Sequence, residues 1–155
     1  MRCLVSAVAA MLLAAMPAHA QSRPPMDIRM PIAPGLWTDT FRKIPCANVT
    51  SGYVFDGKRW GSFYFYGPNS TLGPNAELQP ITATKAVAGG FTQMQFGGYD
   101  TPGTMRVKSL DTNRALYRVN AGGQESDEEL IRCAFNTLSP RMQAGLRKHA
   151  PAIAN

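Results

Sequence analysis

The chain has 155 residues and a formal net charge of +6, and 45% of its residues are hydrophobic. This length predicts one domain with a core large enough to fold alone. With two histidines and three cysteines, the chain has few residues that could form a histidine-dependent catalytic triad or a histidine-rich metal site.

The first 20 residues have the three parts of a secretory signal peptide. Arg2 lies near the amino end, an apolar run spans Leu4–Met16, and Ala18-His19-Ala20 supplies small residues for cleavage. The apolar run is too short to cross a membrane. We therefore expect an exported protein, periplasmic or secreted, that begins at Gln21 and has no transmembrane segment. Loss of Arg2 reduces the 16 basic residues to 15, against ten acidic ones, so the charge becomes +5.

Residues 21–34 carry Pro24, Pro25, Pro31 and Pro34 and few large apolar side chains. This composition predicts an extended, mobile arm. We place an antiparallel β domain at residues 35–138 and a C-terminal helix and tail at residues 139–155.

Two cysteines, Cys46 and Cys133, remain after cleavage removes Cys3. An even pair in an exported chain favours a disulfide over a metal site or a reactive nucleophile. Closing a loop of about 86 residues would stabilise the fold by about 4 kcal/mol if chain entropy dominates.

Residues 79–96 predict a β-hairpin about Gly89-Gly90, because a two-residue glycine loop suits the primed turns, which need positive φ. With that loop, Lys85 faces Met94 on the inward side of the sheet. An unpaired ammonium group is too costly to bury. We therefore expect Lys85 to reach the barrel mouth, pair with a carboxylate, or meet the anionic head of a ligand.

A second hairpin is predicted at residues 104–119, with Asp111–Asn113 as a three-residue loop in which Asn113 takes the left-handed conformation. This loop makes both strands amphipathic. The inward side chains are then Met105, Val107, Ala115, Tyr117 and Val119. The outward side chains are the cations Arg106, Lys108, Arg114 and Arg118.

In this register Arg106 lies directly opposite Arg118, and like charges that face each other across a ladder cost stability. Together with the charge of +5, this predicts that the four cations form an anion-facing patch. Its partner would be an anionic envelope surface or an acidic protein, and nucleic acid is disfavoured for an exported chain. The alternative is that these side chains extend into water and only keep the protein soluble.

Further strand-like segments lie at residues 36–44, 49–55 and 59–66, and the turn sequence Asp56-Gly57-Lys58 joins the last two. Residues 67–76 predict a loop. Seven to eight antiparallel strands in chain order describe an all-β fold, either an up-and-down barrel or a flattened sandwich. A short C-terminal helix is predicted through His149, with Ser139 as its N-cap and Pro140 at its first position.

Residues 129–135 fit two patterns. Ser126 and Glu129 have the spacing of a capping box, which predicts a helix. Ile131, Cys133 and Phe135 alternate, which predicts a strand. We favour the strand, because a last strand joined through Cys133 to the first would close a barrel. The carboxylates at 127–129 are interpreted as a solvated loop or helix start.

The strand at 59–66 carries aromatic residues on both faces, whereas a half-exposed strand alternates apolar and polar residues. Phe63 and Phe65 can fill the barrel, which leaves Trp60, Tyr64 and Tyr66 outside. Alternatively the roles reverse, and the barrel has a tyrosine-lined cavity. The outer row is then either covered by the arm or the C-terminal helix, or free as a ligand or partner surface.

Gly35-Leu36-Trp37 resembles the Gly-x-Trp motif of the lipocalin-like (calycin) families. Arg132 is placed like the arginine that packs over the tryptophan in those families. The resemblance implies a barrel whose interior holds a small apolar ligand. Only these residues carry it, and the families' Thr-Asp-Tyr element is missing, since Tyr99-Asp100 does not reproduce it.

The sequence has no phosphate loop, dinucleotide fingerprint or Gly-x-Ser-x-Gly motif. We therefore favour a protein that is not an enzyme, although a carboxylate pair among the ten acidic residues is still open, and we expect no cofactor and no metal. Two functions remain: an exported, non-enzymatic lipocalin-like protein that binds a small apolar or amphiphilic ligand, or an interaction module, such as an inhibitor or a cell-envelope accessory protein, that acts through surface contacts. The candidate ligand-binding residues are Trp37, Trp60, Tyr64, Tyr66 and Lys85.

Overall fold

The computed structural model describes residues 28–41, 43–66, 71–97, 103–121 and 124–154, with the backbone alone at 119–121. The predicted signal peptide, residues 1–20, and the cleavage point before Gln21 lie outside the described residues. In the described part, no helix is both long and apolar enough to span a membrane.

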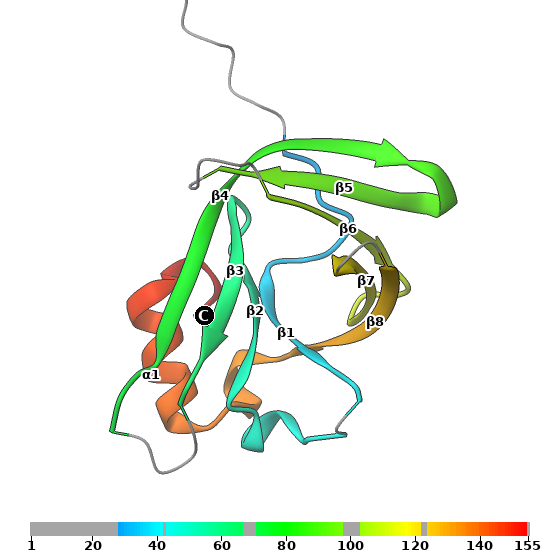
Figure 1. Cartoon of the computed structure of the whole chain (residues 1–155). Helices are drawn as coiled ribbons and strands as arrows, with labels where there is room; N and C mark the ends of the chain where they lie inside the picture. Colours follow the sequence, from blue (N-terminus) through cyan, green and yellow to red (C-terminus); the bar gives the residue numbers. More distant parts are fainter. Residues whose placement is uncertain (1–27, 42, 67–70, 98–102, 122–123, 155) are drawn as a thin grey trace, which may run out of the picture.

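The described strands form a closed antiparallel barrel in which each strand pairs with its neighbours in the chain (Figure 1). The last strand pairs back with the first and closes the barrel, as the sequence predicted. The strands are β1 (Gly35–Asp39), β2 (Ser51–Phe55), β3 (Arg59–Tyr64), β4 (Asn75–Val87), β5 (Phe91–Phe96), β6 (Gly103–Ser109), β7 (Arg114–Ala121) and β8 (Gln124–Cys133).

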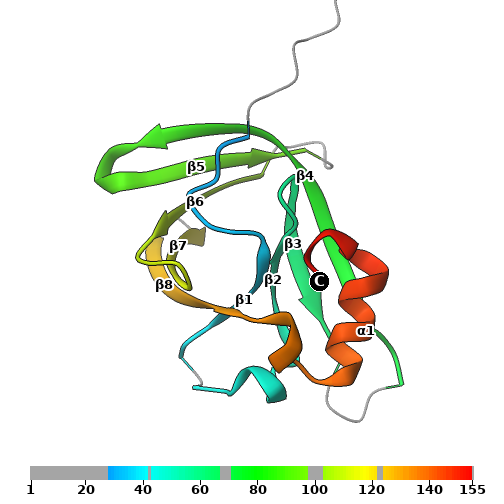
Figure 2. The ribbon, with the colours of Figure 1, turned by 180° about the vertical axis from the view of Figure 1, so that it is seen from behind.

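One α-helix, α1 (Pro140–His149), follows the barrel in the described chain and lies against its outer wall beside β3 and β4 (Figure 2). The Ser139 hydroxyl accepts a hydrogen bond of 3.3 Å from the backbone N–H of Met142, and Pro140 opens the first turn. The predicted helix and its N-cap are therefore confirmed. Short 3-10 turns lie at Cys46–Asn48, Ala88–Gly90, Phe135–Thr137 and Pro151–Ile153.

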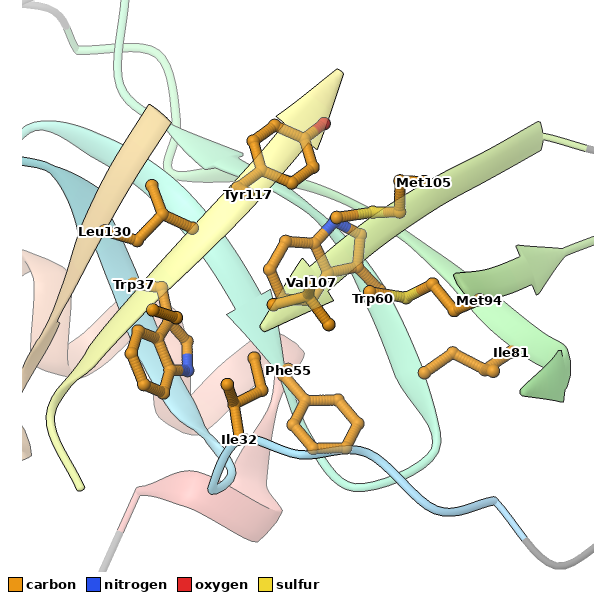
Figure 3. Packing of buried hydrophobic residues seen from close by; sticks show 11 residues of the cluster. Ile32, Trp37, Phe55, Trp60, Ile81, Met94, Met105, Val107, Tyr117 and Leu130 are labelled. Carbon is orange, nitrogen blue, oxygen red and sulfur yellow. The ribbon is translucent and has the colours of Figure 1, made fainter. Parts of the chain in front are cut away.

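Alternation along the strands divides the apolar residues between two cores. Inward residues fill the barrel, and Figure 3 shows how they pack. The inner core contains Ile32, Trp37, Phe55, Trp60, Ile81, Met94, Met105, Val107, Ala115, Tyr117 and Leu130. Outward residues of β1–β3 and β8 pack under α1 and its flanking turns. This outer core contains Leu36, Val49, Val54, Phe63, Cys133, Leu138, Met142, Leu146 and Ala150.

The aromatic strand β3 has the reverse of the orientation that we considered first. Trp60 pairs with Phe55 and lies inside the barrel, whereas Phe63 packs in the outer core against α1. The expectation that Phe63 fills the barrel and Trp60 lies outside is therefore wrong. The C-terminal helix supplies the cover for the outer row, so Phe63 does not need an inward position to be buried.

The first hairpin differs from its prediction by one residue. Val87 faces Phe91, and Lys85 faces Gln93 instead of Met94. The loop is the three-residue turn Ala88–Gly90, in which both glycines have φ of 76°. A slip of one residue moves every side chain to the opposite face. Lys85 is consequently exposed on the outside of the barrel, and its predicted inward position is wrong.

The register of the second hairpin is confirmed, because Arg106 pairs with Arg118 and Lys108 pairs with Leu116. Asn113 does not have the predicted positive φ, since Lys43 is the one non-glycine residue with positive φ in the described chain. Instead, the backbone N–H of Asn113 donates to Oδ1 of Asp111 at 2.8 Å. A side-chain acceptor two residues back thus holds this turn.

Strand β8 confirms the strand interpretation over residues 129–133 and begins earlier than expected, at Gln124. The predicted continuation to Phe135 is wrong, because β8 ends at Cys133 and Phe135 starts a 3-10 turn. The interpretation of residues 127–129 as a solvated loop or helix start is wrong. Asp127 pairs with Arg118 and Glu129 with Leu116, so both point outward, and Glu128 between them pairs with Tyr117. The alternation of a strand thus separates three adjacent carboxylates onto two faces.

Cys46 and Cys133 form the predicted disulfide, which joins the β1–β2 connection to the end of β8. Residues 28–34 pack onto one end of the barrel, where Ile32 is 6% exposed and Ile28 and Met30 contact the inner core. The described part of the predicted mobile arm is therefore a cover that closes this end of the barrel.

Candidate functional site

The end of the barrel opposite this cover is open. Two adjoining depressions lie there, with volumes of about 260 and 220 Å³, and they share Tyr53 and Ser62. We call their inward-facing lining the barrel mouth. It consists of Asp39, Tyr53, Trp60, Ser62, Tyr64, Glu77, Gln79, Phe96, Met105 and Tyr117. Each volume is below the roughly 300 Å³ at which the usual range of ligand sites begins, so the mouth can hold only a small molecule.

Three aromatic rings form the floor of the barrel mouth. Trp60 stacks on Tyr53, with centroids 5.5 Å apart and an interplanar angle of 15°. The ring of Tyr117 lies 5.0 Å from that of Tyr53 and 6.1 Å from that of Trp60, tilted against both. Figure 3 shows Tyr117 at the top of the inner core, with Trp60 below it and overlapping Val107 in this view. Residues from β2, β3 and β7 therefore build one aromatic platform.

The two phenols of the platform, Tyr53 and Tyr117, hydrogen-bond to each other. Burial raises the pKa of Tyr53, and the negative charges of Glu128 and Asp39 raise it further, against the opposing effect of this hydrogen bond. Burial also raises the pKa of Tyr117. Both hydroxyls therefore stay neutral at physiological pH, and the platform supplies ring faces and hydroxyl dipoles.

Three carboxylates surround the platform. Asp39 ends β1, Glu77 pairs with Ser62 across β3 and β4, and Glu128 pairs with Tyr117. Because directly paired residues share a face, Glu77 and Glu128 lie on the inward face at this end of the barrel. No cluster of three metal-ligating side chains occurs among the described residues. The carboxylates thus surround the mouth separately.

The carboxylates differ in their hydrogen bonding. Oε1 of Glu77 accepts a hydrogen bond of 2.9 Å from the hydroxyl of Tyr64. Hydrogen bonds with Tyr66 and with Glu77 raise the pKa of Tyr64 to about 12. Oδ1 of Asp39 is buried and has no hydrogen-bond partner in the described structure. Buried polar atoms normally have partners, so Asp39 is suited to receive a donor from a ligand.

The structure brings two of the five candidate ligand-binding residues, Trp60 and Tyr64, to the barrel mouth. Trp37 is fully buried near the closed end, where its indole N–H donates to the carbonyl of Ala33 at 3.1 Å. Tyr66 is 61% exposed and accepts a hydrogen bond of 3.0 Å from Asn75. Lys85 lies on the outer face. These three residues are therefore not part of the mouth.

The four cations of the predicted anion-facing patch do lie together on the outer face of β6 and β7, but carboxylates of β8 pair with three of them. Arg106 reaches Glu125 at 2.9 Å, and Arg114 reaches Glu129 at 2.7 Å. Arg118 holds Asp127 through two hydrogen bonds of 2.5 and 2.7 Å.

Lys108 and Arg118 also lie over the ring of Phe91. The uncompensated repulsion behind the patch prediction is therefore absent, because β8 supplies the counter-charges. The hydrogen bond with Arg118 lowers the pKa of Asp127, which is consistent with this pairing.

Tyr53, Asp39, Glu77 and Glu128 were not predicted as site residues from the sequence, and Tyr117 was predicted only as a core residue. Each of them lies at an inward position of its strand. The one signal in the sequence is that acidic residues recur at such positions, and the signal becomes visible only once the strand register is known.

Two larger hollows, of about 420 and 520 Å³, lie outside the barrel near the C-terminal segment. The first lies between β1, the end of β8 and the turns on either side of α1, and the second lies between residues 47–50, Phe65 and the start of α1. Neither combines aromatic rings with carboxylates. A third hollow, of about 410 Å³, adjoins the barrel mouth and is lined by Asp39, Thr40, Phe41, Asp127, Glu128 and Glu129, so it has carboxylates but a single aromatic ring. The barrel mouth is therefore the better candidate, although it is smaller.

No protein-family model, curated protein or solved structure matches this chain. What the chain binds is therefore inferred from its own geometry and chemistry.

Proposed function

We propose that this chain is an exported, non-enzymatic binding protein, lipocalin-like in its architecture, that holds a small amphiphilic molecule in the barrel mouth. The observation that carries this proposal is the aromatic platform of Tyr53, Trp60 and Tyr117 at the open end of a barrel whose other end is covered. The disulfide and the signal-peptide features of residues 1–20 support export, because disulfides persist in oxidising compartments.

The packing of the barrel limits the size of the ligand. Trp37, Met94, Val107 and Leu130 have no exposed surface, so side chains already fill the middle of the barrel. A long apolar chain would have no space there. A molecule at the mouth would instead place an apolar part on the rings and a polar part toward Ser62, Gln79 and the carboxylates. This division favours an amphiphilic ligand over a purely apolar one.

The chemistry of the mouth favours binding over catalysis. Its phenols are neutral, and its lining includes no histidine, lysine or cysteine among the described residues. His149 lies outside the barrel, next to Phe63 in the outer core. The mouth thus lacks a nucleophile with an adjacent base.

Native mass spectrometry of the protein, purified from the cells that naturally make it, tests this proposal. We expect a complex that is heavier than the polypeptide by the mass of one small molecule and that loses this mass after denaturation. A polypeptide with no added mass, from a preparation that was never denatured, would contradict the proposal.

One observation favours the alternative of an interaction module. Phe41, Tyr66 and Leu72 are 92%, 61% and 66% exposed, and each lies in a connection at the open end of the barrel. Exposed apolar side chains gathered at one end are typical of a protein contact. In the same mass spectrum, a second polypeptide in place of a small molecule would support this alternative.

A further inference from the structure

Ion pairing separates the acidic residues of the described chain into two groups. Asp56, Asp111, Glu125, Asp127 and Glu129 each pair with an arginine. Asp39, Glu77 and Glu128 have no ion-pair partner among the described residues. Asp39 and Glu77 line the barrel mouth, and Glu128 lies beside it in an adjoining hollow that shares Asp39. The unpaired negative charge of the described chain is thus concentrated where the barrel is open.

These unpaired carboxylates occur in a chain whose net charge is positive. With 16 basic and ten acidic residues, the chain has more than enough cations to pair every carboxylate. Nevertheless, no lysine, arginine or histidine of the described part lines the two depressions of the mouth. A concave site lined by one sign of charge attracts ligands of the opposite sign.

The aromatic platform also favours a positively charged ligand. Aromatic ring faces carry negative electrostatic potential and attract cations, most strongly in tryptophan. Trp60 and Tyr53 form the stacked pair, and Tyr117 adds a third ring. Rings and carboxylates at one mouth therefore select for a positive group attached to an apolar body.

We propose that the ligand of the barrel mouth is a small organic cation, an ammonium group attached to an apolar or aromatic body. The ammonium group lies among Asp39, Glu77 and Glu128, and the body lies on the Tyr53, Trp60 and Tyr117 rings. This inference rests on the proposed function and adds the sign of the ligand's charge to it.

Three probes of similar size separate charge from shape: 2-phenylethylammonium, 2-phenylethanol and 3-phenylpropanoate. Each is titrated into the folded, disulfide-bonded protein, and backbone amide NMR shifts locate the site and give its affinity. We expect the cation to shift the resonances of mouth residues and to bind roughly tenfold more tightly than the alcohol, a difference of about 1.4 kcal/mol. The carboxylate should bind most weakly.

Two variants remove the same single charge from different faces. Glu77→Gln should weaken binding of the cation several-fold and leave binding of the alcohol unchanged. Glu125→Gln is the matched control, because Glu125 is an exposed residue of β8 that pairs with Arg106 and Arg118 on the outer face. It should leave binding of all three probes unchanged.

The outcomes distinguish this inference from the proposed function. If the alcohol or the carboxylate binds at the mouth as tightly as the cation, the inference is overturned and the mouth remains a ligand site. If no probe shifts the mouth resonances at millimolar concentration, the inference is also overturned. The retained mass in the native spectrum then decides the proposed function separately.

Discussion

The indole ring of Trp60 in β3 and the phenol ring of Tyr53 in β2 are stacked, with centroids 5.5 Å apart. The third ring of the platform, Tyr117 in β7, follows Trp60 by 57 residues, and the strands β4, β5 and β6 lie between them in the chain. The stacked pair forms between the adjacent strands β2 and β3, whereas the contact of Tyr117 with it depends on the barrel closing in one register. The platform is therefore preformed, and a ligand would not have to order it.

Replacing Trp60 by alanine tests its position inside the barrel. Trp60 is 4% exposed and packs in the inner core, so Trp60→Ala should lower the free energy of unfolding by about 3 to 5 kcal/mol. Tyr66→Ala is the control, because Tyr66 is an exposed aromatic residue beyond the end of the same strand, and it should cost about 0.5 kcal/mol. Urea denaturation measures both. If both variants lost the same free energy of unfolding, Trp60 would lie outside the barrel.

Gly145→Ala tests how closely α1 packs on the barrel. In an exposed helix this change stabilises by up to about 1 kcal/mol. Here the added methyl group would overlap Pro74 and lie 2.7 Å from Cζ of Phe63, so we predict a loss of about 1 to 3 kcal/mol instead. The sign of the change in thermal or chemical stability is decisive. A stabilised variant would mean that α1 is not packed on Phe63.

Removing the disulfide should destabilise the protein through the unfolded chain. The two cysteines are 87 residues apart, and closing such a loop contributes about 4 kcal/mol if chain entropy dominates. We predict that the double variant Cys46→Ser/Cys133→Ser loses stability of this order in chemical denaturation. Reducing agent should lower the stability of the unmodified protein and leave that of the variant unchanged. Reactive thiols in the unreduced, denatured protein would contradict the bond.

Asp56 makes stability depend on acidic pH. Burial alone would raise the pKa of its carboxyl group, but hydrogen bonds from the backbone N–H groups of Lys58 and Arg59 and from the Arg59 guanidinium lower it below 3.8. A carboxyl group with a lowered pKa stabilises the folded state above its unfolded pKa, and this contribution is lost as the pH falls through the folded pKa.

Asp56→Asn should therefore cost about 1 to 2 kcal/mol at pH 7, because charge-assisted hydrogen bonds are lost. Its stability should also fall less steeply than that of the unmodified protein as the pH is lowered below about 4. Thermal unfolding over a pH series measures the two slopes. If the stability of Asp56→Asn and of the unmodified protein changed in parallel with pH, the hydrogen bonds of this turn would not stabilise the ionised form of Asp56.

The two hairpins show what the sequence could predict and why. In the second hairpin, apolar and basic residues alternate on both strands, so a single loop length puts Val107 and Tyr117 on one face, and the predicted register was right. In the first, alanine and threonine near Lys85 give almost no contrast between the faces. The predicted loop length therefore rested on Gly89-Gly90 alone. A glycine pair is compatible with a two-residue turn and with the three-residue turn that the structure has.

The site could be predicted only in part. The dense aromatic residues of β3 pointed to Trp60 and Tyr64, which do lie at the mouth. Glu77 and Glu128 resemble ordinary surface carboxylates, because their inward position depends on pairing with residues in other strands. The prediction for Phe63 failed for a related reason, since the outer cover comes from a helix more than 70 residues later.

The arginines on the outer face should not act as an anion-binding patch. Arg106 and Arg118 are paired with Glu125 and Asp127, so little of their charge is available to a polyanion. We predict that Arg106→Gln/Arg118→Gln elutes from heparin at the same salt concentration as the control Arg147→Gln/Lys148→Gln, which removes two charges from exposed positions of α1. If Arg106→Gln/Arg118→Gln elutes at a clearly lower salt concentration than the control, these arginines do form an anion-binding patch.

Blocking the barrel mouth tests the central claim most directly. Ser62 lines both depressions, so Ser62→Trp places a large ring in the proposed binding space, and Thr104→Trp places the same ring at an exposed position on β6. Native mass spectrometry of the unmodified protein and of both variants, made in the same cells, measures the retained small molecule. We predict that Ser62→Trp loses it and that Thr104→Trp retains it at the level of the unmodified protein. Retention by a folded Ser62→Trp variant would contradict a ligand site at the mouth.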